Sequence, residues 1–122
     1  MGKKESVVER GKRVLEEHEK RKEKIRKQFN IDDFIRDAEE VREVEVDYGG
    51  ETLIIKYKSL RNKDNFELAK IEDDQKRSVK TLYIMLSRAD PNVTEEKVEN
   101  LNPILTQRIL AEISKRELSF LT

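Results

Sequence analysis

The sequence contains no cysteine and no tryptophan, and its 122 residues include only two prolines and four glycines. Without cysteine the chain forms no disulfide bond and offers neither a thiol nucleophile nor a cysteine ligand for zinc. Cysteine-free chains suit a reducing compartment, so we expect a cytoplasmic location. No stretch approaches the roughly 18 apolar residues that a membrane span requires, and the sequence predicts no contact with a membrane.

Positive and negative charges are equal in number. Charged residues make up 43% of the chain, yet 26 basic and 26 acidic side chains give a formal net charge of zero. Net charge therefore favours neither a nucleic acid nor an anionic surface as the partner. At this length and with 35% hydrophobic residues, the chain is expected to form one domain with a modest core.

The first 30 residues (1–30) form a charged segment that we name the N-terminal arm. From Lys3 to Phe29 there is no proline, and Lys, Arg and Glu fill nearly every exposed position, which predicts a long helix. Six residues, all apolar or small except His18, recur at spacings typical of a weak coiled-coil seam: Val7, Gly11, Val14, His18, Ile25 and Phe29. We expect this arm to form a homo-oligomer through Val14, Ile25 and Phe29.

Residues 31–122 form the second region, and its clearest local signal is a β-hairpin. Two alternating segments flank Gly49 and Gly50, the pair that a two-residue hairpin turn prefers. With these glycines as the loop, the register predicts three pairs: Val46 with Leu53, Val44 with Ile55, and Glu43 with Lys56. An isolated hairpin is marginal in water, so its apolar face must lie on helices or the hairpin must add to another sheet.

Helices are predicted on both sides of the hairpin. Before it, Asp32 is expected to cap a short helix whose inward face carries Phe34, Ile35, Ala38 and Val41.

After the hairpin, three or four helices are predicted. The stretch from Phe66 to Leu86 is helical in pattern, Thr94 caps a short helix, and Asn102-Pro103 starts the last. This order predicts an α+β fold: a mainly helical small domain with one β-hairpin and a long charged N-terminal helix.

Residue types that carry catalysis do not occur together. His18 is the only histidine and lies among glutamates, where a solvated side chain is the ordinary outcome. The acidic pairs Asp32-Asp33 and Asp73-Asp74 lack the glycine turn and spaced ligands of a calcium loop, and are interpreted as helix N-terminal residues. No phosphate-binding glycine loop or dinucleotide fingerprint is present. The sequence therefore predicts no enzyme, no cofactor and no metal site.

The N-terminal arm raises an alternative function, that of a nucleic-acid-associated regulatory protein. Between Lys3 and Lys27 eleven Lys or Arg stand against six Glu, a net charge of about +5. Cations along one side of a helix contact phosphates. The glutamates stand three or four residues from these cations and favour ion pairs within the helix, so nucleic acid is not the expected partner.

An apolar tip lies near the end of the sequence, at Leu118, Phe120 and Leu121. A small monomer does not normally expose such a group of side chains. Two interpretations stay open: the tip folds back onto the core, or it docks into a partner or a second copy. In the second case these three residues are the candidate partner-binding residues.

From about Ile31 to Leu118 the local features follow one another in a familiar order. They are the helix start Asp33-Phe34-Ile35, the glycine-turned hairpin, Ala89-Asp90-Pro91-Asn92, Thr94-Glu95-Glu96, Glu99-Asn100-Leu101 and the helix from Ile104 to Ile113. In this order the chain resembles the tail assembly chaperones of long-tailed phages, of the siphovirus and myovirus type, and of related proviruses. The N-terminal arm does not belong to the family pattern.

The resemblance implies a non-enzymatic helper in the host cytoplasm. Members of that family bind the extended tape measure protein while tail tube subunits polymerise around it. The expected partner is therefore the tape measure protein, with Leu118, Phe120 and Leu121 in contact with it. A small structural tail or adaptor protein is a further alternative.

Overall fold

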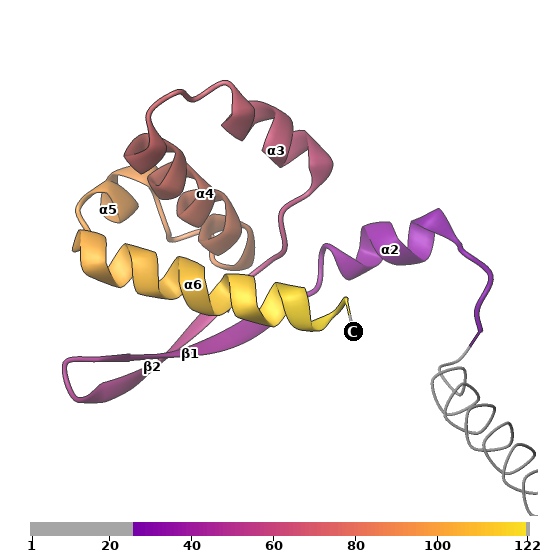
Figure 1. The fold of residues 1–122 in the computed structure, drawn as a ribbon, viewed down its shortest axis with the longest axis horizontal. Coiled ribbons are helices and arrows are strands. Elements are labelled where there is room, and N and C mark those ends of the chain that lie inside the picture. Colours follow the sequence, from indigo (N-terminus) through magenta and orange to yellow (C-terminus); the bar gives the residue numbers. More distant parts are fainter. Residues whose placement is uncertain (1–25, 122) are drawn as a thin grey trace, which may run out of the picture. The chain divides into compact units, whose positions relative to one another are not determined.

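In the computed structural model the described residues are 26–121, and they form five helices and one two-stranded sheet (Figure 1). The elements are α2 (Ile31–Asp37), β1 (Arg42–Tyr48), β2 (Glu51–Tyr57), α3 (Asn62–Ala69), α4 (Asp74–Ala89), α5 (Glu95–Glu99) and α6 (Pro103–Ser119). The chain divides into two units, Met1–Ile31 and Asp32–Thr122. Because the second unit combines helices with one antiparallel hairpin, the predicted α+β class is confirmed.

The hairpin has the register that the sequence predicts. The three expected pairs are present: Val46 with Leu53, Val44 with Ile55, and Glu43 with Lys56. Gly49 and Gly50 have φ angles of 63° and 79°, the left-handed region that both loop residues of a type I′ turn require. In Figure 1, α4, α5 and α6 all lie on one side of the hairpin, which is the side that its buried residues face.

Side-chain caps set the starts of three helices. Asp73, Thr94 and Asn102 each accept a backbone N–H of the following helix, at 2.8, 3.2 and 2.8 Å. Pro103 takes the first position of α6, where its missing N–H costs nothing. A cap of this kind stabilises a helix by about 1 kcal/mol. The starts predicted at Thr94 and at Asn102-Pro103 are therefore confirmed.

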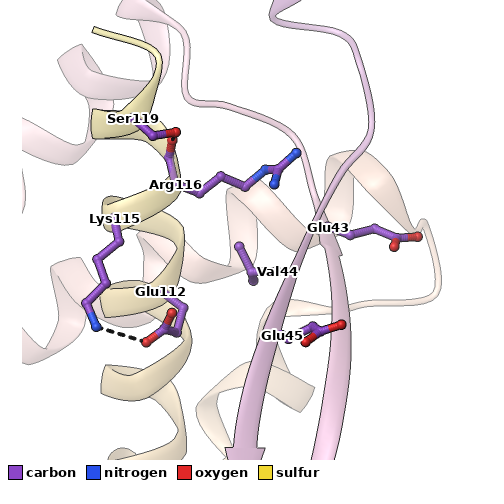
Figure 2. Close-up of a pocket in the computed structure, with 7 residues that line it drawn as sticks. All are labelled: Glu43, Val44, Glu45, Glu112, Lys115, Arg116 and Ser119. Atoms are coloured by element: carbon purple, nitrogen blue, oxygen red, sulfur yellow. Dashed lines mark hydrogen bonds and ion pairs between the residues drawn. The ribbon is translucent and has the colours of Figure 1, made fainter. Parts of the chain in front are cut away.

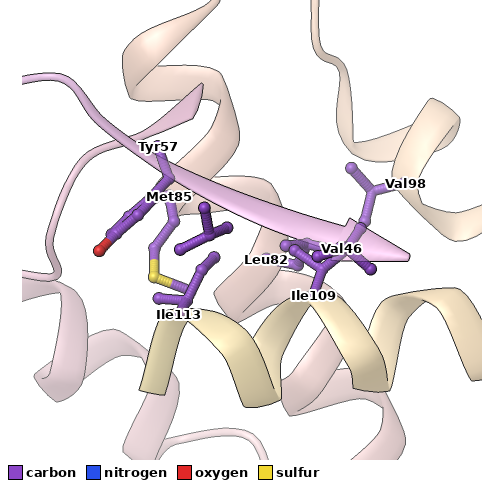
Figure 3. Close-up of a cluster of buried hydrophobic side chains, with 8 residues drawn as sticks. Val46, Tyr57, Leu82, Met85, Val98, Ile109 and Ile113 are labelled. Atoms are coloured by element: carbon purple, nitrogen blue, oxygen red, sulfur yellow. The ribbon is translucent and has the colours of Figure 1, made fainter. Parts of the chain in front are cut away.

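The hairpin and the helices share one core (Figure 3). It consists of Val44, Val46, Tyr57, Leu82, Met85, Val98, Ile109 and Ile113. Tyr57 and Leu82 have no exposed surface. The strands supply three of these side chains, and α4, α5 and α6 supply the others. The strands and the helices therefore bury each other's apolar side chains.

The expected inward face before the hairpin is wrong. Helix α2 buries no residue, and Phe34, Ile35 and Val41 are 54%, 57% and 52% exposed. The last residue of α2 makes a polar contact instead, since Asp37 forms an ion pair with Arg42 of β1. Asp32 lies in the first turn of α2 and does not cap it.

Two predicted helix boundaries also need correction. Arg26 to Asn30 form no helix, so the helix predicted from Lys3 does not include Phe29, and its earlier part lies outside the described residues. The residue before a helix start takes an extended conformation, which ends any preceding helix. The helical stretch predicted from Phe66 begins earlier, at Asn62, and consists of two helices, α3 and α4, because Asp73 caps a new start. Four helices therefore follow the hairpin, within the predicted three or four.

Leu82→Ala tests the shared core. It removes a fully buried side chain and should lower the free energy of unfolding by about 2–5 kcal/mol. Leu118→Ala makes the same change at a side chain that is 62% exposed, and should stay within about 0.5 kcal/mol of the wild type. Urea denaturation followed by circular dichroism measures both, and equal losses would contradict the assignment of Leu82 to the core.

Candidate functional site

The three residues predicted to bind a partner lie together at the end of α6, and we name them the C-terminal surface. Leu118, Phe120 and Leu121 are 62%, 55% and 81% exposed. The N–H of Leu121 donates to the carbonyl of Leu118 at 3.1 Å, so the turn continues beyond the last residue of α6. Leu118 and Leu121 are not folded into the core, and they present apolar surface to solvent.

Phe120 is exposed but held in place. Its ring lies beneath two guanidinium groups, that of Arg42 at 4.7 Å and that of Arg116 at 5.9 Å from the ring centroid. Such cation–π contacts contribute about 0.5–1 kcal/mol each at exposed sites. The start of β1 therefore orients the ring of Phe120 while more than half of the side chain remains accessible.

Arg42 is the centre of a buried polar cluster beside the C-terminal surface. Its side chain is only 9% exposed. It donates to the Ser59 hydroxyl and, at 2.9 Å, to the Asp37 carboxylate, and it lies 3.8 Å from Glu117. Ser59 in turn donates to Glu117. Because a buried guanidinium is costly without such partners, these contacts fasten the last turn of α6 to β1 and α2.

Arg88, at the end of α4, extends the same cluster. Its side chain is 13% exposed and donates to the carbonyl of Ala38 at 3.0 Å and to the carbonyl of Ser59. It also pairs with Glu39 at 2.5 Å and lies 3.8 Å from Asp64. Ser59 accepts from Arg88 through its carbonyl and from Arg42 through its hydroxyl, so it joins the two halves of the cluster.

Asp64 is the one buried carboxylate among the described residues, with 8% of its surface exposed. Burial acts to raise the pKa of Asp64, but hydrogen bonds from the Arg61 side chain and backbone, at 3.0 and 2.9 Å, act against it. Together with the charges of Arg61 and Arg88 they hold the pKa of Asp64 below its ordinary value of 3.8. The cluster is therefore complete only while Asp64 is ionised.

This polar cluster is not predicted by the sequence patterns, although one feature of β1 indicates it. Arg42 has the same strand parity as Val44 and Val46, so the register places its side chain on the buried face. A buried arginine requires acceptors. The acceptors come from segments far apart in the sequence, however, and no local spacing connects them.

A groove of about 740 Å³ lies between β1 and α6, next to the C-terminal surface (Figure 2). It is lined by Glu43, Val44, Glu45, Glu112, Lys115, Arg116 and Ser119. Val44 is its one apolar side chain, and Lys115 pairs with Glu112 at 3.2 Å. The groove therefore offers charges of both signs to a partner, in contrast to the apolar C-terminal surface.

The residues predicted for self-association are not described as a seam by the structure. Val14 and Ile25 lie outside the described residues, and Phe29 is 71% exposed in the irregular segment before α2. The acidic pairs are helix N-terminal residues, as predicted.

Within residues 26–121 no cluster of three or more His, Asp or Glu side chains is suited to a metal ion. In the same part of the chain no helix has the length and apolar content to cross a membrane.

A scan against protein-family models and searches of curated proteins and of solved structures found no match to this chain. The residues of the C-terminal surface and their surroundings are therefore the basis for assigning a function.

Acid should weaken the domain through Asp64. Its folded pKa is lowered, so the stability that its charge contributes is present above the unfolded pKa and is lost as pH falls below about 3.8. Asp64→Asn should be less stable than the wild type at about pH 6, and this difference should narrow towards about pH 3. Urea denaturation at both pH values measures the difference.

Glu45→Gln is the matched control, since Glu45 is exposed and no ion pair is found for it among the described residues. Its stability should follow that of the wild type at both pH values. A difference between Asp64→Asn and the wild type that stays constant with pH would contradict the role given to Asp64.

Proposed function

We propose that this protein is a non-enzymatic tail assembly chaperone, which binds the tape measure protein of a long-tailed phage or provirus in the host cytoplasm. The observation that carries the proposal is the C-terminal surface, with Leu118, Phe120 and Leu121 exposed at one helix end. Burying a large apolar side chain against a partner contributes up to about 1.5–3 kcal/mol. This surface therefore favours an apolar partner.

The spacing of the exposed leucines suits a helical partner. Leu118 and Leu121 are three residues apart, so they lie on the same side of a helical turn. An amphipathic helix presents its apolar residues with the same periodicity, and it is the usual ligand of such a surface. A tape measure protein is long and helical and offers many such segments for one chaperone to cover.

The groove beside α6 supplies the polar border of this contact. Arg116 lines the groove and also lies over the ring of Phe120, so the groove and the C-terminal surface adjoin. Charged side chains around an apolar centre are the ordinary arrangement of a binding surface. Lys115 and Glu45 would pair with polar residues of the partner helix and fix its direction.

The polar cluster supports binding by keeping the surface in one conformation. Arg42 contacts both Glu117 in the last turn of α6 and the ring of Phe120. Side chains that are ordered before binding lose less conformational entropy when the partner arrives. The contacts of Arg42 therefore favour binding without touching the apolar partner themselves.

Coexpression with the tape measure protein tests this function. The full chain should retain that protein at about 0.5 M salt, where charge–charge attraction is strongly screened. Leu118→Ser combined with Leu121→Ser should reduce capture by about tenfold or more, because both apolar contacts are lost. Phe66→Ser, at a side chain of α3 that is 68% exposed, is the matched control and should bind like the wild type.

Two results would contradict the chaperone function, and a third would contradict the binding site assigned to it. Capture of nucleic acid that disappears with salt, and of nothing else, would favour the regulatory alternative. Recovery of the chain in purified tail particles would favour a structural tail or adaptor protein. Undiminished capture by the doubly substituted chain would show that the C-terminal surface is not the binding site.

A further inference from the structure

The two free edges of the hairpin differ in how they are protected. Tyr48 and Glu51 flank the two-residue turn and form a hydrogen-bonded pair, so bonded pairs recur at every second position. The residues between them direct their backbone N–H and C=O groups away from the hairpin. On β1 these residues are Glu43, Glu45 and Asp47, and on β2 they are Thr52, Ile54 and Lys56.

The edge of β1 is blocked against another copy of itself. Arg108 of α6 donates to the outward carbonyl of Asp47 at 2.8 Å, which occupies part of this edge. All three outward residues are exposed and acidic. If two β1 strands paired, carboxylates would face carboxylates, and like charges in that position are destabilising.

The edge of β2 has no such protection. Among the described residues no backbone hydrogen bond reaches the outward groups of Thr52, Ile54 or Lys56. The next outward N–H, that of Lys58, donates to the carbonyl of Met85 at 3.1 Å, so α4 closes this edge only beyond the end of β2. Ile54 is 64% exposed. It pairs with exposed Glu45, between buried Val44 and Val46, so it lies on the face of the hairpin opposite to the core.

We propose that β2 is an association site for a second copy of this chain, which pairs with it edge to edge and antiparallel to form a continuous four-stranded sheet. With the two-fold axis at Ile54, this residue faces its own counterpart on the outer side of the sheet. Thr52 then faces the counterpart of Lys56, and on the inner side Leu53 faces the counterpart of Ile55. Every facing pair is apolar or free of like charge, which is the cross-strand chemistry that stabilises a sheet.

A second copy fits this edge because the sequence of β2 is complementary to itself. Ile54 faces its counterpart on the axis, and every other pair occurs twice around it, as in other symmetric dimers. The central residue is β-branched and therefore suited to a strand. The association uses neither the C-terminal surface nor the N-terminal arm, so its outcome is independent of the proposed chaperone function.

Cysteine cross-linking tests the register directly, because the chain contains no cysteine of its own. Facing residues of a hydrogen-bonded antiparallel pair have Cα atoms about 5.5 Å apart, which a disulfide spans. Ile54→Cys should therefore convert to a covalent dimer on mild oxidation. Val41→Cys, at an exposed apolar side chain outside both strands, should form no covalent dimer under the same conditions. Failure of Ile54→Cys to cross-link more than Val41→Cys would overturn the proposal.

Amide hydrogen exchange and sedimentation of the full chain complete the test. With rising protein concentration the amides of Thr52, Ile54 and Lys56 should become protected by about tenfold or more, while those of Glu43 and Glu45 should not.

Ile54→Lys places like charges across the axis and should abolish the dimer in sedimentation, whereas Val41→Lys should keep it. A dimer that survives Ile54→Lys, or protection of β2 that needs a different protein, would overturn association between two copies at this edge.

Discussion

One apolar face of a two-stranded hairpin determines the rest of this domain. Val44, Val46 and Tyr57 all point to the same side, and two strands alone cannot cover them. Helix α6 packs along β1 and α4 packs against β2, and their side chains fill the space between. Burial of each large apolar side chain contributes about 1.5–3 kcal/mol only when strands and helices are both in place, so the domain is expected to unfold as one cooperative unit.

The same constraint determines where the candidate site lies. The middle of α6 is committed to the core through Ile109 and Ile113, whereas its last turn passes beyond the strand that it covers. Leu118 therefore leaves the core although it belongs to the same helix. Beyond the core, the end of α6 is held by Arg42, which forms an ion pair with Glu117 and lies over the ring of Phe120. Buried Ile109 and Ile113 and exposed Leu118 are therefore parts of one helix.

Short-range rules account for what was predictable. The hairpin register follows from the two glycines and strict alternation, and the helix starts at Thr94 and Asn102 follow from their own side chains. The exposure of α2 was not predictable, since an amphipathic pattern does not say whether another element will cover it. Nor was the cluster around Arg42, whose acceptors lie in separate segments, or the contact of Arg108 with β1, which joins residues 61 positions apart. Those features depend on tertiary packing, which local sequence patterns do not record.

The packing of α6 against β1 has a consequence for the synthesis of the chain. The hairpin leaves the ribosome well before Ile109 and Ile113, the side chains that cover it. Contacts between such distant segments cannot form until the later one has been made, and they slow folding because a long loop must be closed. During that interval the inner face of the hairpin is uncovered and the edge of β2 is open, which is the state most prone to aggregation. The nascent chain is thus prone to aggregate until translation has produced α6.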